Sequence, residues 1–287
     1  MLDACPSRPE WPVPLQQHDS FARTLAAMGI DSARHDLTDP FRAPVGTALV
    51  VLRRLGPIRI AWLPRGPVWT PGICPGTRRD ALIRLRRTVA RPLLATFEDG
   101  NDARGLRLAA PREMARIDLR SDPAALRAAL HGKWRNRLRR AERADCAVTH
   151  RPLDPLRDAP LIDREAAQRR VRGYRALPSS FTLAWARANP HGTCLFLAQN
   201  RGEITAFMLF LLHGTAATYH AGWSGAEGRA ASAHALILWR AMLWLRAQGF
   251  TRLDLGHHDA ARAPGLARFK RGAGARLHRT GPTCLLP

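Results

Sequence analysis

The segment SAHALILWRAMLWLRAQGFTRLDLG, residues 232–256, carries the clearest fold signal in the sequence. Its first part is strongly apolar and ends at Gly249, which is typical of a buried helix closed by a glycine. The run TRLDLG that follows predicts a short buried strand. Upstream, apolar runs predict three more strands over residues 193–200, 203–213 and 215–223, and two helices over residues 161–172 and 180–189. Strands that alternate with helices in this way predict a mixed α/β domain.

The N-terminal half shows helices and strands in a similar order. Apolar periodicity predicts helices over residues 15–29 and 77–91. Short apolar runs predict strands over residues 47–54, 58–64, 92–98 and 105–111. A chain of 287 residues is longer than a typical single domain. Two related α/β domains are therefore expected, over residues 1–145 and 146–287, with one larger domain as the alternative.

Residues 122–143 predict a long helix with two different faces. Asp122 is a favourable N-cap, and Pro123 suits the first helical position. The apolar face consists of Leu126, Leu130, Trp134, Leu138 and Ala141. The opposite face is basic, with six cations and one acid between residues 133 and 143. Because like charges one turn apart repel, such a face is suited to an anionic partner. A solvated face in an arginine-rich chain explains it equally well.

The charge of the whole chain also favours an anionic partner. The sequence has 45 Lys+Arg against 23 Asp+Glu, a formal net charge of +22. Clustered cations attract phosphate groups and release counterions when they bind nucleic acid. Lysine occurs only at Lys133 and Lys270, so 43 of the 45 cations are arginine. Since a GC-rich genome produces the same arginine bias, the charge indicates the kind of partner without identifying it.

Cysteine usage and hydropathy indicate a cytoplasmic protein. The cysteines are odd in number, widely spaced and form no C-x-x-C: Cys5, Cys74, Cys146, Cys194 and Cys284. This pattern argues against a disulfide framework and a zinc site, so reduced thiols and no metal or redox cofactor are expected. The longest apolar runs, 48–52 and 206–212, are far shorter than the ~20 residues of a membrane span. The N-terminal MLDACPSRPEWPVP lacks the pattern of a signal peptide.

Four segments of the chain, taken together, resemble a known family. They are IAWLPRGPVW (60–69), KWRNRLRRAERADCAVTH (133–150), HALILWRAMLWLRAQGFTRLDLG (234–256) and APGLARFKRGAGA (263–275). In this order and spacing they resemble the FemAB/FemX-like aminoacyltransferases and the related GNAT-fold acyltransferases, over residues 15 to 281. The resemblance implies two tandem GNAT-like domains, each a twisted mixed sheet flanked by helices, with a substrate cleft between them.

The resemblance also implies a reaction. In the best-known members, an aminoacyl group passes from aminoacyl-tRNA to an amine of a cell-wall (peptidoglycan) precursor carried on a nucleotide or lipid diphosphate. Others of this fold use an acyl-CoA. The leading hypothesis is therefore an aminoacyl-tRNA-dependent transferase that forms an amide on a phosphorylated, amine-bearing acceptor. An acyl-CoA-dependent N-acyltransferase is the first alternative, and a non-catalytic protein that binds RNA or another polyanion is the second.

Lys270 is the leading catalytic candidate. It follows Phe269, and the resemblance implies that a lysine at this F-K position supports the transition state. An ammonium group is a compact point charge that can approach one oxygen from any direction, whereas guanidinium is a planar fork suited to bidentate partners. This difference would explain a lysine flanked by Arg268 and Arg271 in a chain that otherwise uses arginine. Chance is the alternative explanation.

Other candidates are expected to bind substrate or transfer protons. Arginine forks match phosphate oxygens, so the phosphate-binding candidates are Arg65, Arg135 and Arg139, with Lys133 at the start of the basic segment. Arg65 is equally well explained as a turn residue beside Gly66 and Pro67.

The end of the strand over residues 251–256 supplies the proton-transfer candidates. Asp254 or His257 could relay a proton from the incoming amine, although a strand-ending aspartate more often caps the next turn. On the preceding strand, Tyr219, His220 and Trp223 are expected to line the same cleft, and core packing is the alternative for Tyr219.

Residues 229–234 bear on the identity of the acyl donor. A CoA-binding GNAT usually presents a Q/R-x-x-G-x-G/A turn whose amides hold the pyrophosphate at a helix N-terminus. Here Arg229 is retained, but Ser232 and His234 stand where the two glycines would be. The imidazole of His234 is expected to crowd a diphosphate, which favours a tRNA-borne donor over acyl-CoA.

Overall fold

The computed structural model describes residues 11–89, 92–102, 104–144, 146–173 and 176–286. The chain divides into two compact units. The N-terminal unit comprises residues 13–113 and 278–287, and the C-terminal unit comprises residues 1–12 and 114–277. Within the described residues each unit has a seven-stranded mixed sheet with helices against it, which confirms the predicted fold class.

The sheet of the N-terminal unit has the order β1-β2-β3-β5-β14-β6, with β4 paired to β2. Its strands are β1 (Ser32–Thr38), β2 (Pro44–Leu55), β3 (Ile58–Pro64), β4 (Val68–Trp69), β5 (Leu93–Thr96), β6 (Leu106–Ala109) and β14 (Thr283–Leu286). Its helices are η1 (Leu15–Gln17), α1 (Asp19–Ala27), α2 (Pro75–Thr88) and η2 (Gly100–Asp102). Ala48 and Val50 of β2 join Leu82 and Leu85 of α2 in one buried cluster. The alternation of β2 thus directs one of its faces to α2.

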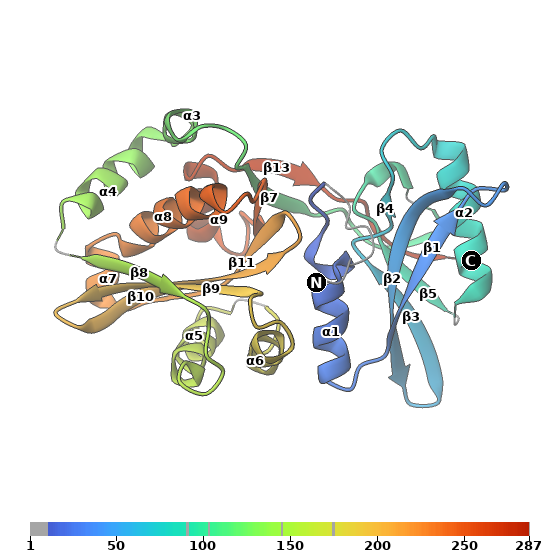
Figure 1. Cartoon of the computed structure of the whole chain (residues 1–287), viewed down its shortest axis with the longest axis horizontal. Coiled ribbons are helices and arrows are strands. Elements are labelled where there is room, and N and C mark those ends of the chain that lie inside the picture. Colours follow the sequence, from blue (N-terminus) through green and yellow to red (C-terminus); the bar gives the residue numbers. More distant parts are fainter. Residues whose placement is uncertain (1–10, 90–91, 103, 145, 174–175, 287) are drawn as a thin grey trace, which may run out of the picture. The chain divides into compact units, whose positions relative to one another are not determined.

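The sheet of the C-terminal unit has the order β13-β7-β12-β11-β10-β9-β8. Its strands are β7 (Glu113–Asp118), β8 (Ala147–Arg151), β9 (Thr193–Asn200), β10 (Glu203–His213), β11 (Ala216–Ser224), β12 (Arg252–His257) and β13 (Arg276–Arg279). Its helices are α3 (Pro123–Ala128), α4 (Gly132–Glu142), α5 (Ala159–Val171), α6 (Ser179–Ala188), α7 (Ala226–Ala230), α8 (Ala233–Ala247) and α9 (Pro264–Gly272). Figure 1 shows α4, α8 and α9 on one face of this sheet, and α5 and α6 on the other.

The segment that opened the sequence analysis folds as predicted. The helix α8 runs from Ala233 to Ala247, and Gly249 follows its C-cap with φ 82°, a conformation that glycine adopts without strain. The apolar side chains of α8 are buried around the helix, as the sequence suggested. TRLDLG forms β12, which pairs in parallel with β11.

The predicted boundary at residue 145 differs from the division into compact units. The chain passes between the units near residue 113 and again near residue 277, so β14 returns to the N-terminal sheet. Helices α3 and α4 belong to the C-terminal unit because their apolar stripe packs against its sheet and α8. Leu126, Leu130, Trp134 and Leu138 are all buried in that core. The local helical pattern was therefore correct, but the partner of its apolar face could not be read from the sequence.

The predicted continuous helix over residues 122–143 is wrong. It is divided into α3 and α4 by a turn at residues 129–131. The backbone N–H of His131 donates to the carbonyl oxygen of Gly272 in α9 at 3.0 Å, instead of continuing the helix of α3. Asp122 caps α3 as predicted, because its carboxylate accepts from the N–H of Ala125 at 2.8 Å.

Two irregularities shape the centre of the C-terminal sheet. Strands β11 and β12 pair in parallel only over Ala216–Thr218 and Arg252–Asp254, so each continues beyond the paired segment. Opposite β10 the register of β11 shifts, because Leu209 pairs with Ala221 and Phe210 pairs with Tyr219. His220 is the extra residue of this bulge, which turns Tyr219 and Ala221 to opposite faces of the sheet.

The sequence predicted reduced cysteines, no metal site and no membrane-spanning helix, and the structure describes part of the residues concerned. The cysteines at positions 74, 146, 194 and 284 are not in disulfides, whereas Cys5 lies outside the described residues. Among the residues described, no cluster of His, Cys, Asp or Glu has the arrangement of a metal site. No helix in the described ranges is long and apolar enough to cross a bilayer.

Candidate active site

Lys270 is a buried cation on α9. Its side chain is 4% exposed, whereas its neighbours Arg268 and Arg271 are exposed. The Nζ atom donates to the backbone carbonyl oxygen of His257, at the end of β12, at 2.7 Å. A Cβ added to Gly256 would lie 3.8 Å from Nζ, so the β12 backbone lies directly beside the ammonium. The lysine therefore occupies a place where the protein backbone comes close, while both flanking arginines face water.

The geometry accounts for the choice of lysine over arginine at this position. A compact ammonium fits against one carbonyl oxygen, whereas a guanidinium would bring a larger planar group with five donors into the same buried space. No carboxylate lies within ion-pair distance of Lys270 among the residues that the structure describes. One of its three N–H groups is used by His257, which leaves two donors for another oxygen.

Burial changes the acidity of this ammonium. Removal from water lowers the pKa of Lys270 from the usual 10.5 to about 8. At neutral pH the group is thus still mainly protonated, but its charge is held without a counter-charge nearby. Such a charge interacts strongly with any negative charge that develops in front of it.

Phe269, the residue before Lys270, packs beside two further aromatic rings. The ring of Phe269 lies 6.0 Å from that of Trp134 on α4 and 6.4 Å from that of His234 on α8. Trp134 is buried, and its Nε1–H has no hydrogen-bond partner in the described part of the chain. Gly272 permits close packing here, because a Cβ at this position would lie 2.8 Å from Cδ1 of Trp134. Helices α4, α8 and α9 thus meet at Phe269 and Gly272, on either side of Lys270 in the sequence, and we call Trp134, His234, Phe269 and Lys270 the Lys270 cluster.

The start of α8 connects this cluster to the basic helix. Ser232, the N-cap, has φ 57° in the left-handed region, a conformation more usual for glycine. Its Oγ accepts from Nη2 of Arg140 on α4 at 2.8 Å. Arg229 lies on α7, and its Nη1 donates to the carbonyl oxygen of Ser224 at 2.6 Å. A helix N-terminus with a guanidinium attached is an electrostatically favourable place for an anion.

The expectation that His234 crowds a donor diphosphate is not supported by the position of its ring. Its Nε2 lies 3.2 Å from the carbonyl oxygen of Phe207 and 3.0 Å from that of Trp223. Because both partners are acceptors, we assign the proton to Nε2. Burial lowers the pKa of His234, in agreement with a neutral imidazole. The side chain is thus directed to the strand carbonyls of β10 and β11 instead of the turn before α8.

The predicted phosphate-binding residues of α4 separate into two groups. Lys133 and Arg139 are exposed, and within the described residues neither has a hydrogen-bond partner. Arg135 is half-buried, and its Nη2 donates to the carbonyl oxygens of Ala128 and Leu130 at 3.2 and 2.9 Å. Arg135 therefore caps the end of α3 through Nη2, and its role as a phosphate ligand stays a prediction.

Arg65 belongs to the N-terminal unit and is held internally. It has φ 51° and precedes the cis peptide bond Gly66-Pro67, so the turn interpretation describes its backbone correctly. Its Nε and Nη2 donate to the two carboxylate oxygens of Glu98 at 2.9 and 3.2 Å. This bidentate pair occupies the guanidinium edge that was expected to bind phosphate.

The two proton-relay candidates have other roles in the structure. Asp254 is 1% exposed and forms ion pairs with Nε of Arg116 at 3.1 Å and with Nη2 of Arg252 at 3.3 Å. Its carboxylate is thus engaged by two arginines within the sheet. His257 contributes its backbone carbonyl oxygen to Lys270, while its side chain is exposed. The end of β12 thus contributes a backbone carbonyl oxygen to Lys270, while proton relay by Asp254 or His257 stays a prediction.

The three candidates on β11 are divided by the bulge. Tyr219 packs on the α8 face, with its ring 6.0 Å from that of Phe210, so its core-packing alternative is the one observed. His220 faces α6, where its Nε2 lies 2.7 Å from Oγ1 of Thr182, and burial lowers its pKa to about 4. Trp223 packs on the same face as His220, with the guanidinium of Arg164 5.8 Å from its ring centroid. These residues do not line one common surface.

Trp134 and His234 pack on Phe269, and Arg140 donates to Ser232, yet the sequence did not identify these three as site residues. Trp134 was assigned only to an apolar stripe, and Arg140 only to a basic face. Trp134 and Arg140 are six residues apart, a spacing that does not indicate a shared site. Which face of α4 meets α8 depends on tertiary packing. His234 was considered only as an obstacle to the donor.

Comparison with known proteins is consistent with this geometry. Residues 129–271, which include α4, α8 and α9, match the sequence model of the acetyltransferase (GNAT) domain. The chain therefore contains a GNAT domain. None of the curated protein sequences matches it.

Solved structures extend the likeness to both units. The GNAT chain described here superimposes on FemX with a TM-score of 0.75 and 14% identity, covering 95% of this chain and 92% of FemX. The C-terminal domain of a putative lysylphosphatidylglycerol synthetase from Agrobacterium fabrum gives 0.54 and 17%, with 93% and 87% covered. A tandem GNAT protein from the clavulanic acid biosynthesis pathway gives 0.51 and 14%, with 91% and 86% covered. The tandem GNAT architecture expected from the sequence is thus confirmed.

Proposed function

We propose that this GNAT-fold protein transfers an aminoacyl group from aminoacyl-tRNA to an amine of a phosphorylated cell-wall or peptide-like acceptor. The observation that carries the proposal is the buried ammonium of Lys270, with one hydrogen bond to His257 and no acidic partner among the described residues. Two N–H groups of this cation remain for the oxygen of a reacting acyl group.

The reaction needs little more than positioning and charge stabilisation. The neutral amine attacks the ester carbonyl carbon, a C–N bond forms, and the carbonyl oxygen becomes an oxyanion. Lys270 then donates to this oxyanion, which is a stronger acceptor than the ground-state carbonyl oxygen. When the C–O bond to the terminal ribose breaks, the proton lost by the amine passes to the ribose hydroxyl. The products are an amide and a deacylated tRNA.

The basic surface of α4 supports a polyanionic donor. Arg137, Arg139 and Arg143 are exposed there, close in sequence to Arg140, which touches Ser232 at the start of α8. Phosphates of a tRNA acceptor stem could therefore bind along α4 while the acylated end reaches the Lys270 cluster. The acceptor class rests on the sequence resemblance to FemAB/FemX-like proteins.

The turn before α8 favours a second candidate, an acyl-CoA-dependent N-acyltransferase. Ser232 adopts the left-handed conformation that a glycine would adopt in the CoA-binding turn, and the imidazole of His234 is directed to the strands. The substitutions that argued against acyl-CoA thus leave the shape of this turn compatible with a pyrophosphate.

One experiment separates these functions. The purified chain is incubated with a pool of radiolabelled aminoacyl-tRNAs, or with acetyl-CoA, together with nucleotide-linked peptide precursors that bear a free amine. We expect acceptor-dependent deacylation of tRNA with a stable amide product. Turnover of acetyl-CoA with inert aminoacyl-tRNAs would select the second candidate.

Lys270 is tested in the same assay. Lys270→Ala should reduce kcat about 100-fold, and Lys270→Arg should not restore it, whereas Arg271→Ala on the exposed side of α9 should be close to wild type. A chain that binds tRNA with a steep salt dependence, shows no turnover and is unaffected by Lys270→Ala would be a polyanion-binding protein instead.

A further inference from the structure

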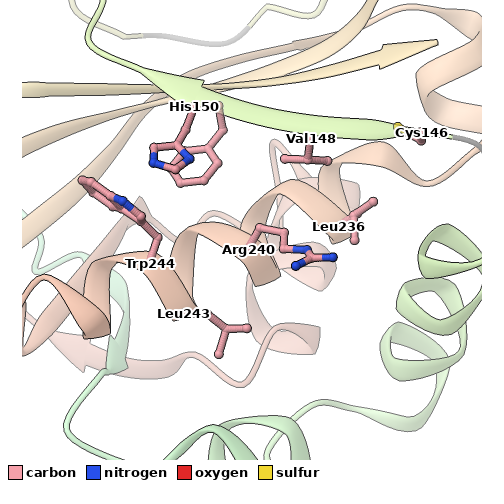
Figure 2. A pocket seen from close by; sticks show the side chains of 8 residues that line it. Cys146, Val148, His150, Leu236, Arg240, Leu243 and Trp244 are labelled. Atoms are coloured by element: carbon pink, nitrogen blue, oxygen red, sulfur yellow. The ribbon is translucent and has the colours of Figure 1, made fainter. Parts of the chain in front are cut away.

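A cavity of about 390 Å³ lies in the C-terminal unit between the edge strand β8 and helix α8. It is lined by Cys146, Val148, His150, Phe196, Leu236, Arg240, Leu243 and Trp244. Figure 2 shows His150 and Trp244 at one end, Cys146 and Leu236 at the other, and Arg240 reaching in from α8. The cavity shares no residue with the Lys270 cluster. Its size falls within the range of small-molecule sites in proteins.

The wall of this cavity combines aliphatic side chains with three aromatic rings, those of His150, Phe196 and Trp244. The ring of His150 stacks on Phe196 with centroids 5.0 Å apart and an interplanar angle of 23°. The indole of Trp244 lies 5.2 Å from the His150 ring and 6.0 Å from the Phe196 ring, so the three rings support one another. Val148, Leu236 and Leu243 complete the apolar lining. Such a wall favours a hydrocarbon body, and flat rings in particular.

Arg240 provides the charge. No acidic side chain lines the cavity, and no hydrogen-bond partner of Arg240 is found in the described ranges. The charge of Arg240 contributes to lowering the pKa of Glu142, but both oxygens of Glu142 already accept from Arg127 at 2.8 and 2.7 Å. The guanidinium edge of Arg240 is therefore open to an anion, and its planar fork suits a carboxylate.

We propose that this cavity is a binding site for a small carboxylate with an aromatic or branched apolar body. Its carboxylate would pair with Arg240, and its body would lie against Trp244, His150 and the aliphatic wall. A nucleotide fits these observations less well, because a base edge and a sugar need several hydrogen-bonding groups. Besides Arg240, the polar side-chain atoms of the wall come from His150, Cys146 and the single N–H of Trp244.

The proposal is tested by isothermal titration calorimetry with naphthalene-2-carboxylate and its neutral counterpart, naphthalene-2-carboxamide. The carboxylate should bind to one site and at least about tenfold more tightly than the amide, because its hydrogen bonds to Arg240 are charge-assisted. Arg240→Gln should remove this preference and leave the affinity for the amide unchanged. Arg187→Gln, which alters an exposed arginine on α6, is the matched control and should change neither affinity.

Location is tested by filling the cavity. Val148→Trp, on the edge strand β8, should abolish binding of both compounds while thermal unfolding shows a folded chain. The proposal is overturned if the carboxylate and the amide bind equally, if Arg240→Gln retains the preference, or if binding survives Val148→Trp. Tighter binding of AMP than of naphthalene-2-carboxylate would overturn the assigned ligand class.

Discussion

Replacement of Lys270 by methionine should stabilise this protein at neutral pH. The ammonium is 4% exposed and has no carboxylate partner among the described residues, so the folded state holds a charge that water would solvate better. Its pKa is lowered from 10.5 to about 8. A shift of this size corresponds to about 3 kcal/mol of destabilisation at pH 7. Methionine has a similar length and carries no charge, so it removes this penalty.

The net effect is smaller because one hydrogen bond is lost. The bond from Nζ to the carbonyl oxygen of His257 contributes about 1 kcal/mol. Lys270→Met should therefore raise the free energy of unfolding by about 2 kcal/mol at pH 7. A buried lysine that lowers the free energy of unfolding by this amount is expected where the residue also has a function.

The pH dependence separates this explanation from simple repacking. The folded pKa lies below the unfolded value, so the unfolded state binds more protons between about pH 8 and pH 10.5. The penalty is thus complete below pH 8 and is relieved as the pH rises through that window. At pH 10 less than about 1 kcal/mol of it should remain, and the advantage of methionine should disappear.

The assay is urea unfolding of wild type and Lys270→Met, followed by circular dichroism at pH 7 and pH 10. Taking the difference between the two proteins cancels the titration of all other groups. The reasoning is refuted if the variant is less stable than wild type at pH 7, or if the difference between them is the same at both pH values. Lys133→Met, at the other and exposed lysine, is the control and should show no such pH dependence.

Three further predictions follow from the same site. If Lys270 acts as an ammonium, kcat should decrease as the pH rises through about 8 in wild type, and a profile that continues to rise to pH 10 would exclude this role. Gly272→Ala should lower the free energy of unfolding by about 1–3 kcal/mol, because its Cβ would meet Trp134 at 2.8 Å, whereas Gly265→Ala has open space and should be neutral or stabilising in thermal unfolding. Asp254→Asn removes the charge shared by Arg116 and Arg252 and should cost about 3 kcal/mol of stability; a large loss of kcat in the folded variant would show that Asp254 acts in catalysis after all.

Local sequence patterns determined most of the secondary structure. The apolar run from residue 232 and its terminating Gly249 predicted α8, and the run TRLDLG predicted β12. The stripe from Leu126 to Ala141 predicted a buried helical face, and its members are in the core. These predictions were confirmed because spacing along the chain fixes which side chains share one face of a helix or strand.

The sequence also singled out Lys270, although its catalytic role remains a prediction. The signal was chemical: a lysine between two arginines, in a chain that otherwise uses arginine for nearly all its cations. That this lysine is buried while both neighbours are exposed could not be read from the sequence. Burial depends on how α9 lies against β12, and this is decided by contacts between residues far apart in the chain.

Tertiary structure alone decided the roles of most other candidates. Arg135 caps α3, Arg65 pairs with Glu98, and Asp254 pairs with Arg116 and Arg252, although each was a candidate for acting on a substrate. The sequence shows which side chains are charged. Whether a charged side chain forms an ion pair within the protein or remains able to bind a ligand depends on which groups the fold places next to it. That outcome depends on long-range packing, since an ion pair forms between whichever opposite charges the folded chain places within reach.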